Sequence, residues 1–316
     1  MAEGAKGGGE VASLDLMRSP SRDLFVNASF RFGRFDCDPE HALWRVDNRS
    51  GPWPLIAFPG TPVEIMQADF PAVIATTGCM VLYNPYRPYR RRLIDRRGDH
   101  CVFLGIAPAL LRELLVEHDP AAADRSAPFV RASGSLGPRA RLDQALLLRA
   151  LERSASVDAV AVEEALLELC VGALVGERPR QRPATVRGRH REVARALARH
   201  LATSFHERQD LQDISSAVGV STFHAARVFR AVTGETIHGY RHALRLFAVL
   251  ERLGEPRVEL TELALEHGFA SHSHLTTAFR QAFGAPPSYW RARLQRSSLA
   301  ALADARRLVP RARARF

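Results

Sequence analysis

The chain has 316 residues, of which 46% are hydrophobic and 25% are charged, and both proportions are ordinary for a soluble globular protein. At roughly 100–200 residues per domain, this length predicts two domains. The charge is uneven, because residues 1–179 carry 21 basic and 23 acidic side chains whereas residues 180–316 carry 23 basic and 11 acidic ones, a net charge of +12. This imbalance predicts an anionic partner for the second half alone.

Membrane and secreted classes are not expected. No stretch approaches ~18 consecutive apolar residues, so no membrane span is predicted. The start of the chain, MAEGAKGGGE, has no apolar segment after a basic one, so no secretory signal is expected and the predicted location is the cytoplasm.

The cysteines are too few for a disulfide scaffold and are expected to be reduced thiols: Cys37, Cys79, Cys101 and Cys170. A metal site built from Cys79 and Cys101 with His41 or His100 is an alternative. The lack of a CxxC pair favours inert thiols, and the sequence predicts no metal and no cofactor.

In chain order, residues 1–20 are Gly-rich and aperiodic, which predicts a disordered tail. From residue 24 to residue 106, short apolar or alternating runs such as LFVNASFRF and CVFLGI are separated by Pro, Gly and Asn. This texture predicts about six to eight short strands in a barrel or sandwich. Helical spacing of apolar residues follows at 107–118, 138–154 and 157–175.

The predicted helix 157–175 is apolar on more than one face, so it is expected to pack on the barrel or on the same helix of a second subunit. The second interpretation predicts a homodimer and depends on an apolar set: Val160, Val162, Leu166, Leu167, Leu169 and Val171.

The next stretch, GERPRQRPATVRGR, is rich in Pro and Arg and is typical of a linker. Nearly everything beyond it is predicted to be helical. The predicted division is a disordered tail at 1–20, a first domain at 21–176, a linker at 177–189, a second domain at 190–296 and a basic tail at 297–316.

The basic half contains one pattern twice. Several residue types recur at an offset of 50, and the turn glycines at an offset of 49: Ser221/Ser271, His224/His274, Phe229/Phe279, Arg230/Arg280, Gly234/Gly284, Arg241/Arg291 and Gly219/Gly268. A generic helical repeat is the alternative, but two copies are too few for a solenoid.

Each copy predicts a helix-turn-helix unit. Gly219 and Gly268 supply the positive φ that a tight turn needs, and Ser221 and Ser271 are placed to cap the second helix of each unit. The first helices are expected to turn a few apolar side chains inward: Leu211, Ile214, Leu260 and Leu263. Between the units, a stripe at helical spacing predicts a long connecting helix with one buried face: Ile237, Tyr240, Leu244, Phe247, Leu250 and Leu253.

The segments VGVS, RVFRAVTGETIHGYR and ELALEHGFASHSHLTTAFRQAFGAPPSYWR, within residues 190–296, resemble the DNA-binding domain of the AraC family of bacterial transcriptional regulators. The front half, with YNPYRPYRRRLIDRRGDHC, resembles more weakly the family's cupin-like, effector-binding barrel. The resemblance implies an α+β multidomain protein with an N-terminal barrel and helices and an all-α C-terminal domain of two helix-turn-helix units. It also implies double-stranded DNA as a partner, a small-molecule effector, and RNA polymerase as a further partner.

In such units the N-terminal part of the second helix faces base edges. By resemblance, DNA-facing positions are Thr222, Phe223, Ala226 and Arg227 in the first unit and His272, Ser273, His274 and Thr277 in the second. Arg227 is the strongest single candidate, because a guanidinium can take guanine O6 and N7 together. Ala225 departs from the family's larger apolar residue. The basic positions Arg230, Arg280, Arg241 and Arg291 are interpreted either as phosphate contacts or as solvated charges.

Other functions are less favoured. His272 and His274 face different ways on one helix, which argues against a metal site. A cupin-type small-molecule-binding protein or enzyme with an accessory DNA-binding domain is the alternative, but residues 1–179 contain only His41, His100 and His118. Cys37 lacks the basic neighbours of an activated thiol in a DNA alkyl-repair protein.

Aromatic residues of the predicted strands are interpreted as core rather than as the lining of an effector pocket: Trp53, Tyr83, Tyr86 and Tyr89. The sequence thus predicts a transcriptional regulator without enzyme activity.

Overall fold

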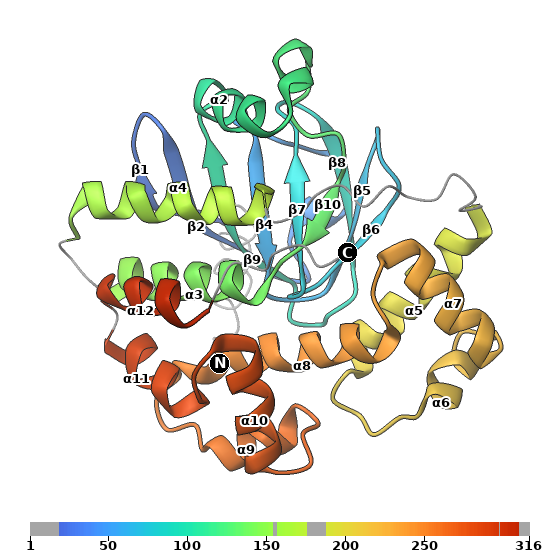
Figure 1. The fold of residues 1–316 in the computed structure, drawn as a ribbon. Helices are drawn as coiled ribbons and strands as arrows, with labels where there is room; N and C mark the ends of the chain where they lie inside the picture. Colours follow the sequence, from blue (N-terminus) through green and yellow to red (C-terminus); the bar gives the residue numbers. More distant parts are fainter. Residues whose placement is uncertain (1–18, 154–156, 176–187, 297, 310–316) are drawn as a thin grey trace, which may run out of the picture.

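The computed structural model of the chain describes residues 19–153, 157–175, 188–296 and 298–309 (Figure 1). The tail predicted for residues 1–20 lies outside the described residues apart from its last two. The linker predicted for 177–189 lies outside them as far as residue 187. Residues 188 and 189 belong to a helix. None of the described helices is long and apolar enough to cross a membrane.

The front half is built from strands that form two antiparallel sheets. The larger sheet has the order β1 (Ser21–Val26), β2 (Phe30–Cys37), β9 (Asp99–Ile106), β4 (Leu55–Pro59), β7 (Cys79–Tyr83) and β10 (Ser133–Ser135). The smaller sheet has the order β3 (Asn48–Arg49), β8 (Pro88–Leu93), β5 (Val63–Gln67) and β6 (Val73–Ala75), with the 3-10 turn η1 (Ala42–Trp44) before β3. Because the chain combines these antiparallel sheets with helices, the α+β class is confirmed. No described strand pairs with both sheets, so a closed barrel is not shown.

The register between β5 and β8 sorts their side chains onto two faces. Ile65 lies opposite Arg91 on one face, and Glu64 lies opposite Arg92 on the other. Because successive side chains of a strand point to opposite faces, Arg91 is directed between the sheets and Arg92 is directed away from them.

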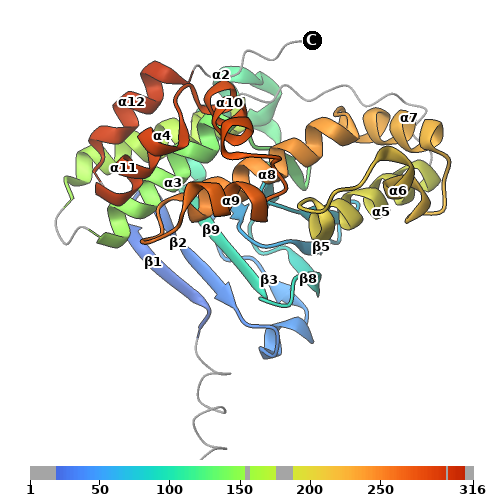
Figure 2. The ribbon, with the colours of Figure 1, turned by 90° about the horizontal axis from the view of Figure 1, so that it is seen from below.

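Helices cover this double sheet. The front half adds α2 (Pro108–His118), the 3-10 turn η2 (Pro120–Asp124), α3 (Pro138–Arg153) and α4 (Ala159–Val175). The back half is all helical: α5 (Gly188–Ser204), α6 (Leu211–Ser216), α7 (Thr222–Thr233), α8 (Ile237–Leu253), α9 (Leu260–Glu266), α10 (His272–Phe283), α11 (Pro287–Arg296) and α12 (Ala300–Leu308). Figure 2 shows α8 running between the group α5–α7 and the group α9–α11.

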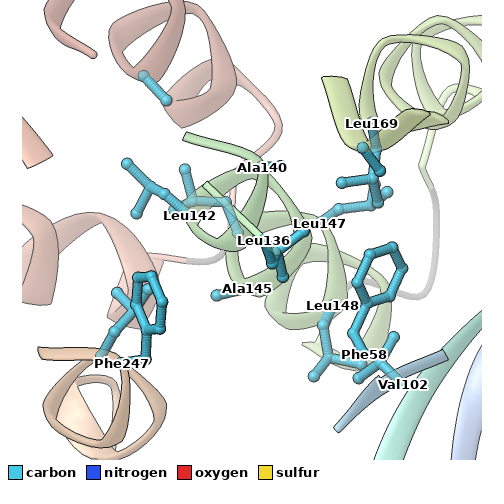
Figure 3. Close-up of a cluster of buried hydrophobic side chains, with 14 of the residues drawn as sticks. Phe58, Val102, Leu136, Ala140, Leu142, Ala145, Leu147, Leu148, Leu169 and Phe247 are labelled. Atoms are coloured by element: carbon cyan, nitrogen blue, oxygen red, sulfur yellow. The ribbon is translucent and has the colours of Figure 1, made fainter. Parts of the chain in front are cut away.

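The two halves share one hydrophobic core, centred on α3. Figure 3 shows Leu148 of α3 beside Phe58 and Val102 of the larger sheet, while Phe247 of α8 lies on the opposite side of the helix. Helices α8, α10, α11 and α12 all contact α3. The back half is therefore joined to the front half by buried apolar surface, which the sequence did not indicate.

Two predicted segments gain a definite place in this core. Most of the described part of the predicted basic tail, residues 298–309, forms α12, whose Ala301, Leu302 and Ala305 are buried. Arg139 of α3 donates hydrogen bonds from Nη1 to the carbonyl oxygens of Ala305 (2.7 Å) and Val309 (3.0 Å) at the end of that helix. The helix expected in this stretch is therefore present, and it packs against α3.

Helix α4 packs against α3 and buries Val162, Leu166 and Leu169, three members of the apolar set from which the sequence predicts a homodimer. Val160 is 66% exposed. Because these apolar side chains already pack inside the chain, they do not show a contact with a second subunit. The homodimer therefore stays a prediction.

Candidate nucleic-acid interface

The first helix-turn-helix unit consists of α6, a glycine turn and α7. Asp210 begins α6 with a capping box, in which its carboxylate accepts from Asp213 N (2.8 Å) and the Asp213 carboxylate accepts from Asp210 N (3.0 Å). Gly219 has φ +72° in the turn, and the Ser221 side chain caps α7 by accepting from His224 N (3.3 Å). The turn glycine and the cap predicted from the sequence are both confirmed.

The second unit repeats this geometry with α9 and α10. Gly268 has φ +79°, and the Ser271 side chain accepts from His274 N (3.1 Å). A Cβ at Gly268 would lie 2.5 Å from the carbonyl oxygen of His206, so this turn is also packed against another segment. A Cβ at Gly219 would meet nothing within 4 Å. The two turns therefore share a backbone conformation but not an environment.

The inward positions predicted for the first helices are only partly correct. Ile214 and Leu263 are buried, and Leu260 is half-buried. Leu211 is 41% exposed, because it is the first residue of the six-residue helix α6 and lies at its solvent side.

The structure places the predicted reading residues on the outer faces of α7 and α10. Phe223 is 77% exposed, Arg227 and Arg230 are exposed, and Thr222 and Ala226 are half-buried. In α10 every predicted position is exposed: His272, Ser273, His274, Thr277 and Arg280. The opposite faces are buried through Ala225, Val228 and Phe229 in α7 and through Leu275, Ala278 and Phe279 in α10. Each helix thus has one exposed face and one packed face.

The connecting helix α8 fixes these two units. The predicted stripe faces inward as expected, but Leu246 and Val249 are buried too, so α8 buries more than one face. The Tyr240 hydroxyl lies 3.2 Å from the Thr76 hydroxyl of the front half. Part of the predicted stripe therefore faces the front half, and the burial of Leu246 and Val249 shows a second packed face that the spacing alone does not indicate.

Of the four arginines that recur at an offset of 50, two are bonded to the backbone or partly buried. Arg241 Nη1 donates to the carbonyl of Gln209 (2.7 Å), and Arg291 is half-buried. Arg245, which the sequence did not single out, donates from Nε to the Phe205 carbonyl (2.6 Å). Arg230 and Arg280 are exposed near the ends of α7 and α10, and for these two the phosphate contact stays a prediction.

A group of imidazoles lies between α8 and α10. The His238 and His242 rings stack 6.0 Å apart, and Phe269 lies edge-on to both His242 and His274. Burial lowers the pKa of His242, and the nearby His238, His274 and Arg245 lower it further. Among the described residues, no group of three His, Cys, Asp or Glu side chains is arranged to hold a metal.

In the front half, the space between the sheets is occupied by a buried arginine. Arg91 donates to Asp99 (Nη1 to Oδ2, 3.0 Å) and to Asn48 (Nη2 to Oδ1, 3.2 Å), and its guanidinium lies 4.5 Å from the centroid of Phe35 and 5.8 Å from that of Tyr89. Tyr83 packs edge-on against Tyr89 at 4.9 Å. Tyr83 and Tyr89 are therefore core residues, as the favoured interpretation had it.

The other two aromatic candidates do not join this cluster. Tyr86 is exposed at a backbone φ of +57°, and Trp53 is half-buried with its ring close to Gly105. The four cysteines, all within the described residues, are thiols. His41 accepts from Leu43 N, and His100 bonds to Asp36.

Two short helices followed by capped helices with exposed polar faces, on the basic half of the chain, define a helix-turn-helix protein. Residues 214–293 match the family described as a helix-turn-helix domain. This part of the chain is therefore similar to the DNA-binding domain of the AraC family, the resemblance that the sequence predicts.

The similar curated proteins cover the same region. The Transposon Tn10 TetD protein of Escherichia coli is 32% identical over 81 residues, which are 26% of this chain and 59% of that protein. The multiple antibiotic resistance protein MarA of Escherichia coli K12 is 30% identical over 81 residues, 26% of this chain and 64% of that protein. The chain spans about three fifths of the length of these relatives.

Solved structures give weaker likenesses. The DNA-binding domain of AdpA in complex with a target DNA is 26% identical and covers 31% of this chain and 90% of that chain, with a TM-score of 0.29. Apo ToxT K231A of Vibrio cholerae is 11% identical and covers 85% of this chain and 98% of that chain, with a TM-score of 0.33. The similarity to known proteins therefore concerns the helix-turn-helix region, residues 214–293.

Proposed function

We propose that this chain is a sequence-specific DNA-binding transcriptional regulator, controlled by a small-molecule signal that its front half helps to sense. The observation that carries the proposal is the pair of capped helices α7 and α10, whose exposed faces lie on a half of the chain with a net charge of +12. A helix-turn-helix unit places its second helix in the major groove. Arg227, Arg230 and Arg280 supply donors for guanine and for phosphate.

The two reading helices differ in the chemistry they offer. Arg227 of α7 can contact a guanine with two hydrogen bonds, whereas Thr277, at the matching place in α10, offers one hydroxyl and one methyl group. The exposed Phe223 adds an apolar surface suited to a thymine methyl group. Because α8 joins the units rigidly, we expect them to enter successive major grooves about 10 base pairs apart on one face of the duplex.

The test is a binding selection by the full chain on randomised duplexes, followed by affinity measurements at several salt concentrations. We expect a selected site in two parts and a logarithmic affinity that falls by roughly 0.9 per phosphate contact for each tenfold rise in salt. A folded chain that selects no sequence and whose DNA affinity is independent of salt would contradict the proposal.

A further inference from the structure

A polar cavity lies where the smaller sheet of the front half meets the first helices of the back half. It has a volume of about 810 Å³ and is lined by residues of β5, β8 and α5 and of the turn that follows α6. Its polar lining includes Glu64, Arg92, Arg195, Arg199, His200 and Thr203. Leu93 and Val218 give it an apolar side.

One buried carboxylate sits at the centre of three arginines in this cavity. The Glu64 side chain is 2% exposed and accepts from Arg92 Nη1 (3.2 Å) and from Arg199 Nη2, while Arg195 Nη1 lies 3.8 Å from its Oε1. The three arginine side chains are 63%, 36% and 42% exposed, in the order Arg92, Arg199 and Arg195. Each guanidinium therefore keeps part of its surface free of Glu64.

The donors in this cluster exceed the acceptors. A guanidinium carries five N–H donors, whereas a carboxylate offers about four lone-pair sites, so Glu64 cannot satisfy three arginines. Among the described lining residues, the other carboxylate is Glu192, which is exposed. A net positive charge with unused forked donors matches a carboxylate or phosphate group.

We infer that this cavity binds a small organic anion, whose carboxylate or phosphate group takes the free N–H donors of Arg92, Arg195 and Arg199. The apolar part of the anion lies against Leu93 and Val218. The space between the two sheets is a poorer candidate, because Arg91 and its aromatic neighbours already occupy it.

The anion would join the two halves of the molecule. Glu64 and Arg92 belong to the front sheet, whereas Arg195 and Arg199 belong to α5, which packs against the reading helix α7. An anion that competes with Glu64 for these arginines thus acts on the element that supports α7. The role of this anion as the signal of the regulator rests on the proposed function. The binding of the anion in the cavity does not rest on it.

The test is calorimetry on the full chain, without DNA, in a phosphate-free buffer of low salt. Phenyl phosphate and benzoate are the two anionic probes, and benzyl alcohol is the uncharged probe of similar size. We expect one site per chain for at least one anion and no binding of benzyl alcohol. Binding of phenyl phosphate alone identifies a phosphate ester, and binding of benzoate alone identifies a carboxylate, as the kind of ligand.

Variants locate the site. Arg195→Gln and Arg199→Gln should each weaken anion binding about tenfold or more, because each removes charge-assisted hydrogen bonds. Arg189→Gln, an exposed arginine of the same helix outside the cavity lining, should leave it unchanged. Glu64→Gln should strengthen binding, because it removes the resident competitor. Arg195 makes the longest of the three contacts with Glu64. Arg195→Gln therefore still tests the site if Glu64→Gln does not fold.

Three results would overturn the site: no heat from either anion, equal affinity for benzyl alcohol, or wild-type affinity in both Arg195→Gln and Arg199→Gln. A chain that selects a DNA site but binds neither anion would remove this inference and leave the proposed function intact. A chain that binds an anion at these arginines but selects no DNA would remove the proposed function and leave the anion site intact.

Discussion

Individual side chains set the chemistry that each unit can offer to DNA. Arg227 and Thr277 occupy matching exposed positions of α7 and α10, with buried neighbours that hold each helix in the same way. Under the proposed function, the difference between the two units at this position is a difference in base readout, because the scaffold beneath it is repeated.

The first prediction concerns this pair. Arg227→Ala should cost roughly 1–3 kcal/mol of binding free energy and relax the base preference in one part of the selected site. Thr277→Ala should cost clearly less, since water readily replaces a single hydroxyl contact. The measurement is a binding selection with each variant, and Arg112→Ala on the exposed side of α2 is the control. An unchanged site with Arg227→Ala, together with lost preference in Thr277→Ala, would reverse the assignment of principal reader.

The second prediction concerns pH. His100 Nδ1 lies 2.8 Å from Asp36 Oδ1 and its Nε2 lies 2.7 Å from the Arg97 carbonyl, so the hydrogen bond to Asp36 and then the carbonyl raise the pKa of His100 above 6.5, although burial opposes this. Burial raises the pKa of Asp36, but His100 and Arg34 outweigh it and the net shift is downward. Asp36 therefore stays ionised across neutral pH.

Because the folded-state pKa of His100 is the higher one, its stabilisation is complete below pH 6.5 and is lost as the pH rises through the folded value. Urea denaturation of the wild type and of His100→Gln between pH 5.5 and 9 measures this. The difference in unfolding free energy should shrink as the pH rises. A difference that grows with pH would show that the imidazole is held neutral.

Among the secondary-structure elements, the two helix-turn-helix units can be compared directly with each other. Both turns need a glycine with positive φ, and both second helices begin at a serine cap. They differ in what surrounds the turn, since Gly268 lies against the His206 carbonyl and the Arg245 guanidinium, and Gly219 is open.

The third prediction uses that difference. Gly219→Ala should cost about 1–2 kcal/mol of unfolding free energy, the usual cost of a left-handed conformation for a residue with a Cβ. Gly268→Ala should cost about 1–3 kcal/mol more, because its Cβ would also meet a backbone oxygen at 2.5 Å. Chemical denaturation measures both variants. Equal losses would mean that the chain around His206 moves aside without cost.

The caps give the fourth prediction. Ser221→Ala and Ser271→Ala should each lower the unfolding free energy by about 1 kcal/mol, because each leaves one N–H donor of α7 or α10 without its side-chain acceptor. DNA affinity should fall equally for all duplexes, since a cap reads no base. A change in the selected sequence would instead place these serines at the DNA.

At the scale of the whole molecule, the back half is not separate from the front half. Phe247, Val249 and Leu250 of α8 belong to the same buried cluster as α3 and the larger sheet, and Arg141 of α3 bonds to Glu251 of α8 and to the Pro59 carbonyl. The position of α10 therefore depends on packing in the cluster shared with the front half, whereas α7 packs in a separate cluster with α5 and the start of α8.

The fifth prediction follows from this shared core. A fragment of residues 180–316 contains both units and the +12 charge and is predicted from the sequence to bind DNA without the front half. It would also expose the face of α8 that the full chain buries against α3, so its unfolding free energy should be lower and its binding of a hydrophobic dye higher. A fragment as stable as the full chain, with no dye binding, would show that the shared core contributes little.

The sequence by itself determined what depends on near neighbours. Serine caps, turn glycines and the stripe of α8 act within about four residues, so their spacing is readable and a repeat makes it readable twice. Residues that need distant partners were not readable. Arg91 and Glu64 look like ordinary strand charges, and the helical spacing of residues 300–308 does not indicate that α12 packs against α3. The tertiary structure decided their burial, because a charge enters the interior only where partners far away in the chain neutralise it.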